Sequence, residues 1–210
     1  MAASVLRVVI ETGQKNVFAS AIDFPGWCRS ARSESAAVDL LLAYRDRYAQ
    51  IASSAEVEVP SEAHITVIQR VHGNATTDFG APSIIAEVEQ GSGSPEQNQT
   101  YGSLLLATWK SFDVVSSGAP SILRKGPRGG GRDTEGAIEH VNTVEQAYVG
   151  KLGIKGGRGV ADRRQLILDD ITAGRSVHTA KGWPSLYAAR RITWHVLDHL
   201  WEIQDRSTPK

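Results

Sequence analysis

Two histidines stand four residues apart near the end of the chain. His195 and His199 lie in RRITWHVLDHLWEIQDRS, residues 190–207, whose pattern is that of a helix with one buried face. The apolar residues of that face recur at intervals of three and four: Ile192, Val196, Leu200 and Ile203. Side chains four residues apart lie one above the other on a helix, so the two imidazole rings could reach one ion. The spacing therefore favours a metal site on the interior side of this helix.

A third ligand would have to come from another helix, and His140 is the candidate. It lies in DTEGAIEHVNTVEQAYVGKL, residues 133–152, at the edge of an apolar face. That face is made by Ala137, Val141, Val144 and Tyr148. Glu145, in the same segment, is a carboxylate alternative. A histidine near an apolar face is also often a core residue with one hydrogen-bonded ring nitrogen, and this interpretation stays open for all three histidines.

A divalent ion held by three imidazoles would keep open coordination positions. Such an ion lowers the pKa of a bound water or thiol, so that a nucleophile exists near neutral pH. The chemistry would be hydrolysis or thiol transfer on a small-molecule substrate, with metal-bound water or thiolate as nucleophile and no side chain assigned as catalytic. Three imidazoles suit zinc, nickel, iron or copper, and we expect zinc or nickel.

Basic, glycine-rich loops precede two of the predicted helices, one at residues 124–132 and one, GIKGGRG, at residues 153–159. The first, RKGPRGGGR at residues 124–132, contains Arg128 and Arg132, which could bind an anionic thiol or a substrate carboxylate together with exposed backbone amides. The other interpretation is a solvated loop. Neither loop matches the phosphate-binding patterns GxxxxGK[ST] or GxGxxG, so nucleotide binding is not predicted.

The second half of the chain is predicted to consist of four helices, which suggests a bundle. These helices cover residues 100–115, 133–152, 161–174 and 185–206, give or take a few residues. Asp133 is the expected N-cap of the second one. The last helix also carries aromatic residues every seven positions, roughly opposite its histidines: Tyr187, Trp194 and Trp201. We expect this aromatic stripe to dock against the N-terminal half or a second subunit, or else to lie at the edge of the bundle core.

The first half is predicted to be a ββα unit followed by further strands. The expected elements are strands at 5–11 and 16–22, one helix at 33–52 capped by Ser33, and strands at 63–71 and 82–89. Residues 90–99, QGSGSPEQNQ, have the composition of a flexible linker. The sequence therefore predicts an α+β protein with two domains, residues 1–92 and 98–207.

The composition is that of an ordinary globular chain. Of its 210 residues 41% are hydrophobic and 22% charged, and 23 Lys and Arg balance 23 Asp and Glu. Because no net charge attracts nucleic acid or acidic lipid, we expect neither partner. No apolar run is long enough to cross a bilayer, and the single cysteine, Cys28, excludes an intramolecular disulfide. A cytoplasmic protein is expected, with a homodimer as one option for its assembly.

The second half resembles the DinB-like superfamily of four-helix bundle proteins. The resemblance rests on GGRDTEGAIEHVNTVEQAYVGKL and, some forty residues later, YAARRITWHVLDHLWEIQDR. That family gathers one histidine of the second helix and an HxxxH pair of the fourth around a divalent metal, which implies His140, His195 and His199 as ligands here. It includes thiol-dependent transferases related to the mycothiol-dependent maleylpyruvate isomerases, so a low-molecular-weight thiol is an implied cosubstrate.

The first half resembles the HicB-like fold. The resemblance rests on the hairpin, the amphipathic helix after it, and the D-x-PG turn formed by Asp23, Phe24, Pro25 and Gly26. In antitoxins of this fold a separate DNA-binding segment accompanies the domain, and no such segment is visible here. Two functions follow as hypotheses: a metal-dependent transferase or hydrolase, or a non-catalytic binding or regulatory protein in which the HicB-like half contacts a partner and the bundle is a scaffold.

Overall fold

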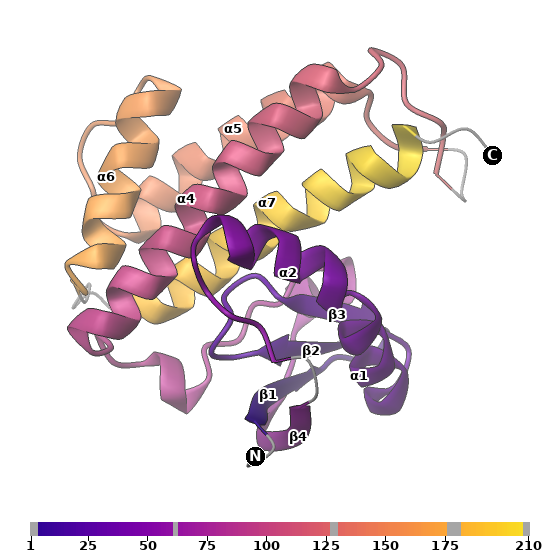
Figure 1. Cartoon of the computed structure of the whole chain (residues 1–210), viewed down its shortest axis with the longest axis vertical. Helices are drawn as coiled ribbons and strands as arrows, with labels where there is room; N and C mark the ends of the chain where they lie inside the picture. The colour runs from indigo at the N-terminus through magenta and orange to yellow at the C-terminus, as the bar shows by residue number, and fades with distance from the viewer. Residues whose placement is uncertain (1–3, 61–62, 127–129, 176–181, 208–210) are drawn as a thin grey trace.

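The computed structural model of the protein describes residues 4–60, 63–126, 130–175 and 182–207. Within these residues a mixed sheet forms the N-terminal part and helices form the C-terminal part, as predicted for an α+β chain (Figure 1). The strands are β1 (Ser4–Thr12), β2 (Val17–Ala21), β3 (Cys28–Ala31) and β4 (Ala63–His72). Their order is β3-β2-β1-β4, with β4 parallel to β1 and the other pairs antiparallel.

The predicted helix at 33–52 is two helices in the structure. Ser33 caps α1 (Glu34–Ala43), as expected, by accepting a hydrogen bond from the backbone N–H of Ala36 at 3.3 Å. The chain leaves α1 at Tyr44, whose φ and ψ of −90° and 1° are not helical, and continues as α2 (Arg45–Ser54). The break lets α1 cover the sheet while α2 turns toward the C-terminal helices.

The predicted strand at 82–89 is wrong. Among the described residues this segment pairs with no strand and ends in a short 3₁₀ helix, η1 (Glu87–Glu89). Its backbone N–H groups are instead bound by a side chain, because the carboxylate of Glu11 accepts from Ser83 and Ile84 at 2.9 to 3.1 Å. The buried Glu11 carboxylate therefore accepts the backbone hydrogen bonds that a neighbouring strand would otherwise accept. A short helix, α3 (Ala75–Phe79), and strand β3 were not predicted.

The four helices predicted in the second half are present. They are α4 (Pro95–Gly118), α5 (Thr134–Lys151), α6 (Val160–Thr172) and α7 (Ser185–Ser207). Asp133 caps α5 as expected, accepting from the N–H of Gly136 at 2.8 Å. Helix α4 begins inside the segment predicted to be a linker, because Ser94 supplies a capping oxygen and Pro95 suits the first helical position. No helix in the described ranges has both the length and the apolar character needed to cross a bilayer.

Helix α7 is buried on both sides, because it lies between the sheet and the other C-terminal helices (Figure 1). From Ser185 to Trp201 every residue except Asp198 is buried. The aromatic stripe docks on the N-terminal half: the ring of Trp194 lies 6.0 Å from that of Phe18, and the ring of Trp201 lies 4.9 Å from that of Tyr44. Of the expectations for this stripe, docking on the N-terminal half is confirmed. The apolar core also runs without interruption from the sheet into the helices.

Candidate metal centre

Two of the three predicted ligands lie on the buried face of α7. His195 and His199 are 6% and 9% exposed, and their ring centroids are 4.8 Å apart. This proximity is expected of side chains four residues apart on a helix, and the two rings meet edge to face. Because α7 is packed on both sides, its rotation about its own axis is fixed and both rings are held toward α5.

His140 is supplied by α5, which packs against α7. Its ring centroid lies 5.2 Å from that of His195 and 4.8 Å from that of His199. The Nε2 atoms of His140 and His195 are 3.2 Å apart. One nitrogen from each of the three rings lies within 4.8 Å of the others, so they could hold one metal ion. The three histidines singled out in the sequence therefore converge.

A carboxylate orients one of these rings from behind. Glu202 Oε2 lies 3.0 Å from Nδ1 of His199, and Glu202 Oε1 accepts from Nη1 of Arg206 at 2.7 Å. A carboxylate on Nδ1 leaves the opposite nitrogen of the imidazole as the lone-pair donor, which is how metal-binding histidines are commonly held. Glu202 was not predicted, although its position three residues after His199 on a helix was a usable signal.

The protonation of the rings favours a metal. Burial lowers the pKa of His140 and lowers that of His195 well below its usual value, and the nearby His199 lowers both further. Both rings are therefore neutral near pH 7 and carry a lone pair. At 3.2 Å one of the facing Nε2 atoms must donate a proton to the other, and a bound cation would take the place of that proton.

The alternative ligand in α5, Glu145, is hydrogen-bonded to residues of α4 and α6. Glu145 is fully buried, and its carboxylate accepts from Trp109 Nε1 at 2.7 Å and from Arg164 Nε at 3.3 Å. Burial raises the pKa of Glu145, while the charge of Arg164 opposes that shift. This residue joins α5 to α4 and α6 and does not belong to the histidine group.

The two arginines predicted to bind an anion have different outcomes. Arg128 lies outside the described residues. Arg132 is exposed just before the N-cap of α5, and its charge contributes to the lowered pKa of His140 and of His195. Its field therefore reaches the histidines, although Arg132 makes no hydrogen bond to them within the described structure.

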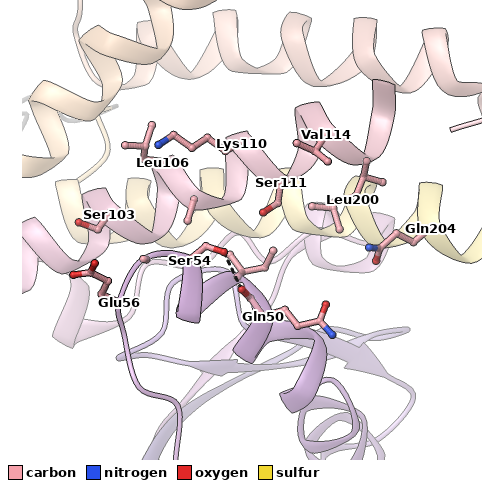
Figure 2. A pocket seen from close by; sticks show the side chains of 14 residues that line it. Gln50, Ser54, Glu56, Ser103, Leu106, Lys110, Ser111, Val114, Leu200 and Gln204 are labelled. Carbon is pink, nitrogen blue, oxygen red and sulfur yellow. Dashed lines mark hydrogen bonds between the residues drawn. The ribbon is translucent and has the colours of Figure 1, made fainter. Parts of the chain in front are cut away.

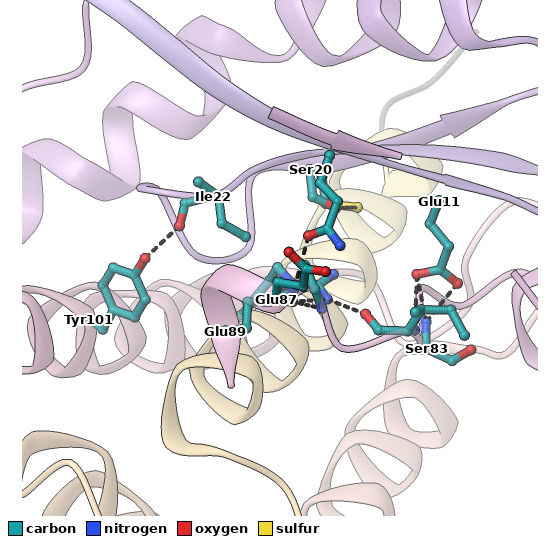
Figure 3. A network of polar contacts seen from close by, with 12 residues as sticks. Glu11, Ser20, Ile22, Ser83, Glu87, Glu89 and Tyr101 are labelled. Atoms are coloured by element: carbon teal, nitrogen blue, oxygen red, sulfur yellow. Dashed lines mark hydrogen bonds and ion pairs between the residues drawn. The ribbon is translucent and has the colours of Figure 1, made fainter. Parts of the chain in front are cut away.

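A buried polar network fixes the start of α7 (Figure 3). Arg190 forms a doubly hydrogen-bonded ion pair with Glu89, in which Nη2 donates to Oε2 at 2.9 Å, and the same nitrogen donates to the carbonyl of Ile84 at 3.0 Å. Tyr101 of α4 donates to the carbonyl of Ile22 in the same region. Because these contacts tie the first turns of α7 to segment 84–89, they also set which side of α7 faces α5.

A groove of about 650 Å³ lies on another side of the molecule, between α2 and helices α4 and α7 (Figure 2). Gln50 and Ser54 line it from α2, and Leu106, Lys110 and Val114 line it from α4. No histidine of the candidate centre lines this groove.

No protein-family model, no curated protein and no solved structure matches the chain.

Proposed function

We propose that the protein is a metal-dependent enzyme that transfers a small-molecule thiol or hydrolyses a small substrate at a divalent ion, zinc or nickel. His140, His195 and His199 would hold the ion. The observation that carries the proposal is the convergence of three imidazole nitrogens within 4.8 Å from two separate helices. The DinB-like resemblance of the bundle and the HicB-like resemblance of the first half are part of this proposal.

The donor set fits a catalytic ion better than a structural one. Structural zinc sites are closed by four protein ligands, whereas catalytic sites have three and an open position. Within the described residues the group contains three ligands, because Glu202 is engaged by His199 and Arg206. When bound there, a divalent ion would supply Lewis acidity and lower the pKa of a water or thiol at its open position.

The protein side chains would position that chemistry. Glu202 holds the ring of His199, and the packing of α7 holds His195. His140 is only half-buried, so a small substrate would reach the ion from the side of α5. Among the described residues no cysteine belongs to the histidine group, so a thiol nucleophile would have to come from a cosubstrate.

Metal binding is the first test of the proposal. The full chain, freed of metal by chelator, is titrated with Zn²⁺ and with Ni²⁺ by equilibrium dialysis. We expect one ion per chain, and we expect His140→Ala, His195→Ala and His199→Ala each to weaken binding by roughly a hundredfold or more. His64→Ala is the matched control, because His64 is exposed on β4, away from the group. Equal binding by all four variants would contradict the proposal.

Reaction chemistry is the second test. The metal-loaded protein is assayed for hydrolysis of 4-nitrophenyl acetate, and for conjugation of cysteine to 1-chloro-2,4-dinitrobenzene. We expect one of the two rates to depend on the metal and to be lost in His199→Ala. If the protein binds one ion at the histidines and accelerates neither reaction, the non-catalytic scaffold becomes the better explanation of the site.

A further inference from the structure

A buried arginine without a hydrogen-bond acceptor lies one helical turn before the histidine pair. Arg191 of α7 is 9% exposed, and its Nη1 is buried without a partner. Within the described structure no carboxylate and no carbonyl accepts a hydrogen bond from its guanidinium. The preceding residue makes a clear contrast, because Arg190 is also buried, at 3% exposed, and is paired with Glu89.

Aromatic rings surround the Arg191 guanidinium. Its central carbon lies 4.6 Å from the ring centroid of Trp194 and 5.6 Å from that of Tyr148. Such contacts stabilise a cation through the ring faces, but they accept none of its N–H hydrogen bonds. The ring of Trp183 packs against that of Tyr148, at 4.9 Å between ring centroids, and adds apolar surface next to it.

Tyr148 brings a second unpaired donor to the same place. Its hydroxyl is buried and has no hydrogen-bond partner among the described residues, and its ring lies 5.9 Å from the ring of His195. The Arg191 guanidinium carbon lies 5.6 Å from the centroid of this ring, so the two groups are close enough to interact. One guanidinium nitrogen and one phenol hydroxyl, both buried and without a partner among the described residues, therefore lie near a candidate metal ligand.

Unpaired buried donors of this kind are costly. Buried cations are normally matched by an anion, and a buried hydroxyl normally finds an acceptor. A carboxylate would satisfy both groups at once, because the planar guanidinium donates two parallel hydrogen bonds to it and the phenol can donate a third. The surrounding rings of Trp183 and Trp194 favour an apolar carbon skeleton attached to that carboxylate.

We propose that Arg191 and Tyr148 form a carboxylate-binding subsite, so that the substrate or cosubstrate of this protein is a small organic acid. The position of the acid relative to a bound ion rests on the function proposed above, whereas the recognition of the carboxylate does not. This subsite differs from the loop at residues 124–132, where the sequence placed the anion-binding residues Arg128 and Arg132.

The test compares propionate with propionamide, its neutral counterpart of nearly the same shape. Both are titrated into the metal-free full chain, and binding is followed by ligand-observed NMR. We expect propionate to bind roughly tenfold more tightly or better, which is the effect of a hydrogen-bonded charge pair. Arg191→Met should remove the preference, and Tyr148→Phe should reduce it severalfold. Arg32→Met is the matched control, because Arg32 is exposed in the N-terminal half, and it should leave the preference within about twofold.

Two results would overturn the subsite. One is equal binding of propionate and propionamide by the unaltered protein, and the other is a preference that survives Arg191→Met. If Arg191→Met does not fold, Tyr148→Phe decides, because it removes only the hydroxyl: a reduced preference supports the subsite and an unchanged preference refutes it. Since the protein is metal-free in this experiment, failure of the subsite is distinct from failure of metal binding at the histidines.

Discussion

Glu202 offers a test of the metal centre that leaves all three proposed ligands in place. In Glu202→Gln the side chain keeps its size and loses its charge, so the carboxylate no longer holds Nδ1 of His199 at 3.0 Å. Loss of such an outer partner typically weakens metal affinity by about 10- to 100-fold. The Glu202 side chain is 32% exposed and shares its charge with Arg206, so we expect the lower end of that range, near tenfold.

The assay is competition for Zn²⁺ against a chromophoric chelator, with the unaltered protein and Glu202→Gln measured side by side. Glu139→Gln is the matched control, because Glu139 is exposed and is the sequence neighbour of His140. It removes the same charge near the same site without touching a ring, and the affinity should change by less than about twofold. Equal affinities for Glu202→Gln and the unaltered protein would refute the idea that this carboxylate orients His199.

Three further predictions concern buried groups away from the histidines. Arg190→Met should lower the free energy of unfolding in urea by about 3–5 kcal/mol, because it leaves the carboxylate of Glu89 buried and unpaired. The pKa of the Cys28 thiol is raised to about 11 by burial, so it should react with Ellman's reagent at about pH 8 only after unfolding. Burial raises the pKa of Asp170 to about 6, above its unfolded value of about 3.9, so this carboxyl contributes stability below about pH 4 that is lost as the pH rises through 6. Asp170→Asn should not lose stability over this pH range, so the variant should be more stable than the unaltered protein at about pH 7. Urea denaturation at about pH 4 and about pH 7 measures both stabilities.

Each of these predictions has a result that would contradict it. For Arg190 that result is an unfolding curve that superimposes on that of the unaltered protein. For Cys28 it is rapid reaction of the thiol in the native protein. For Asp170 it is a pair of stability profiles that stay parallel from pH 4 to pH 7.

The helices of the second half were predictable because local signals determine them. Asp133 caps α5 through its own side chain, and apolar residues at intervals of three and four mark the buried face of α7. The same periodicity placed His195 and His199 on one side of a helix. His140 could be nominated only as a histidine on another helix, because its approach to within 3.2 Å of His195 depends on how α5 packs against α7.

The errors in the first half arise from contacts between distant residues. Segment 82–89 has the composition of a strand, but Glu11 binds its backbone N–H groups, and that partner lies more than seventy residues away. The break at Tyr44 has a similar origin, since its ring packs against Trp201 of α7. Neither contact can be predicted from the local secondary-structure propensity of the residues involved.

The carboxylate-binding subsite shows the same limit within the candidate site. Arginines on a glycine-rich loop match a known pattern of anion binding, whereas nothing in the sequence around Arg191 distinguishes it from other arginines of a helix. Its burial and its missing partner follow from the double-sided packing of α7, which places Trp194 on the sheet and Tyr148 against the same guanidinium.

The central claim is that one ion is held by three imidazoles, and X-ray absorption at the zinc edge measures this directly. The full chain is loaded with one equivalent of Zn²⁺, and His199→Ala is loaded in the same way for comparison. We predict three imidazole nitrogens at about 2.0–2.1 Å from the zinc, falling to two in the variant. A shell made only of oxygen, or the same spectrum from both proteins, would contradict the account.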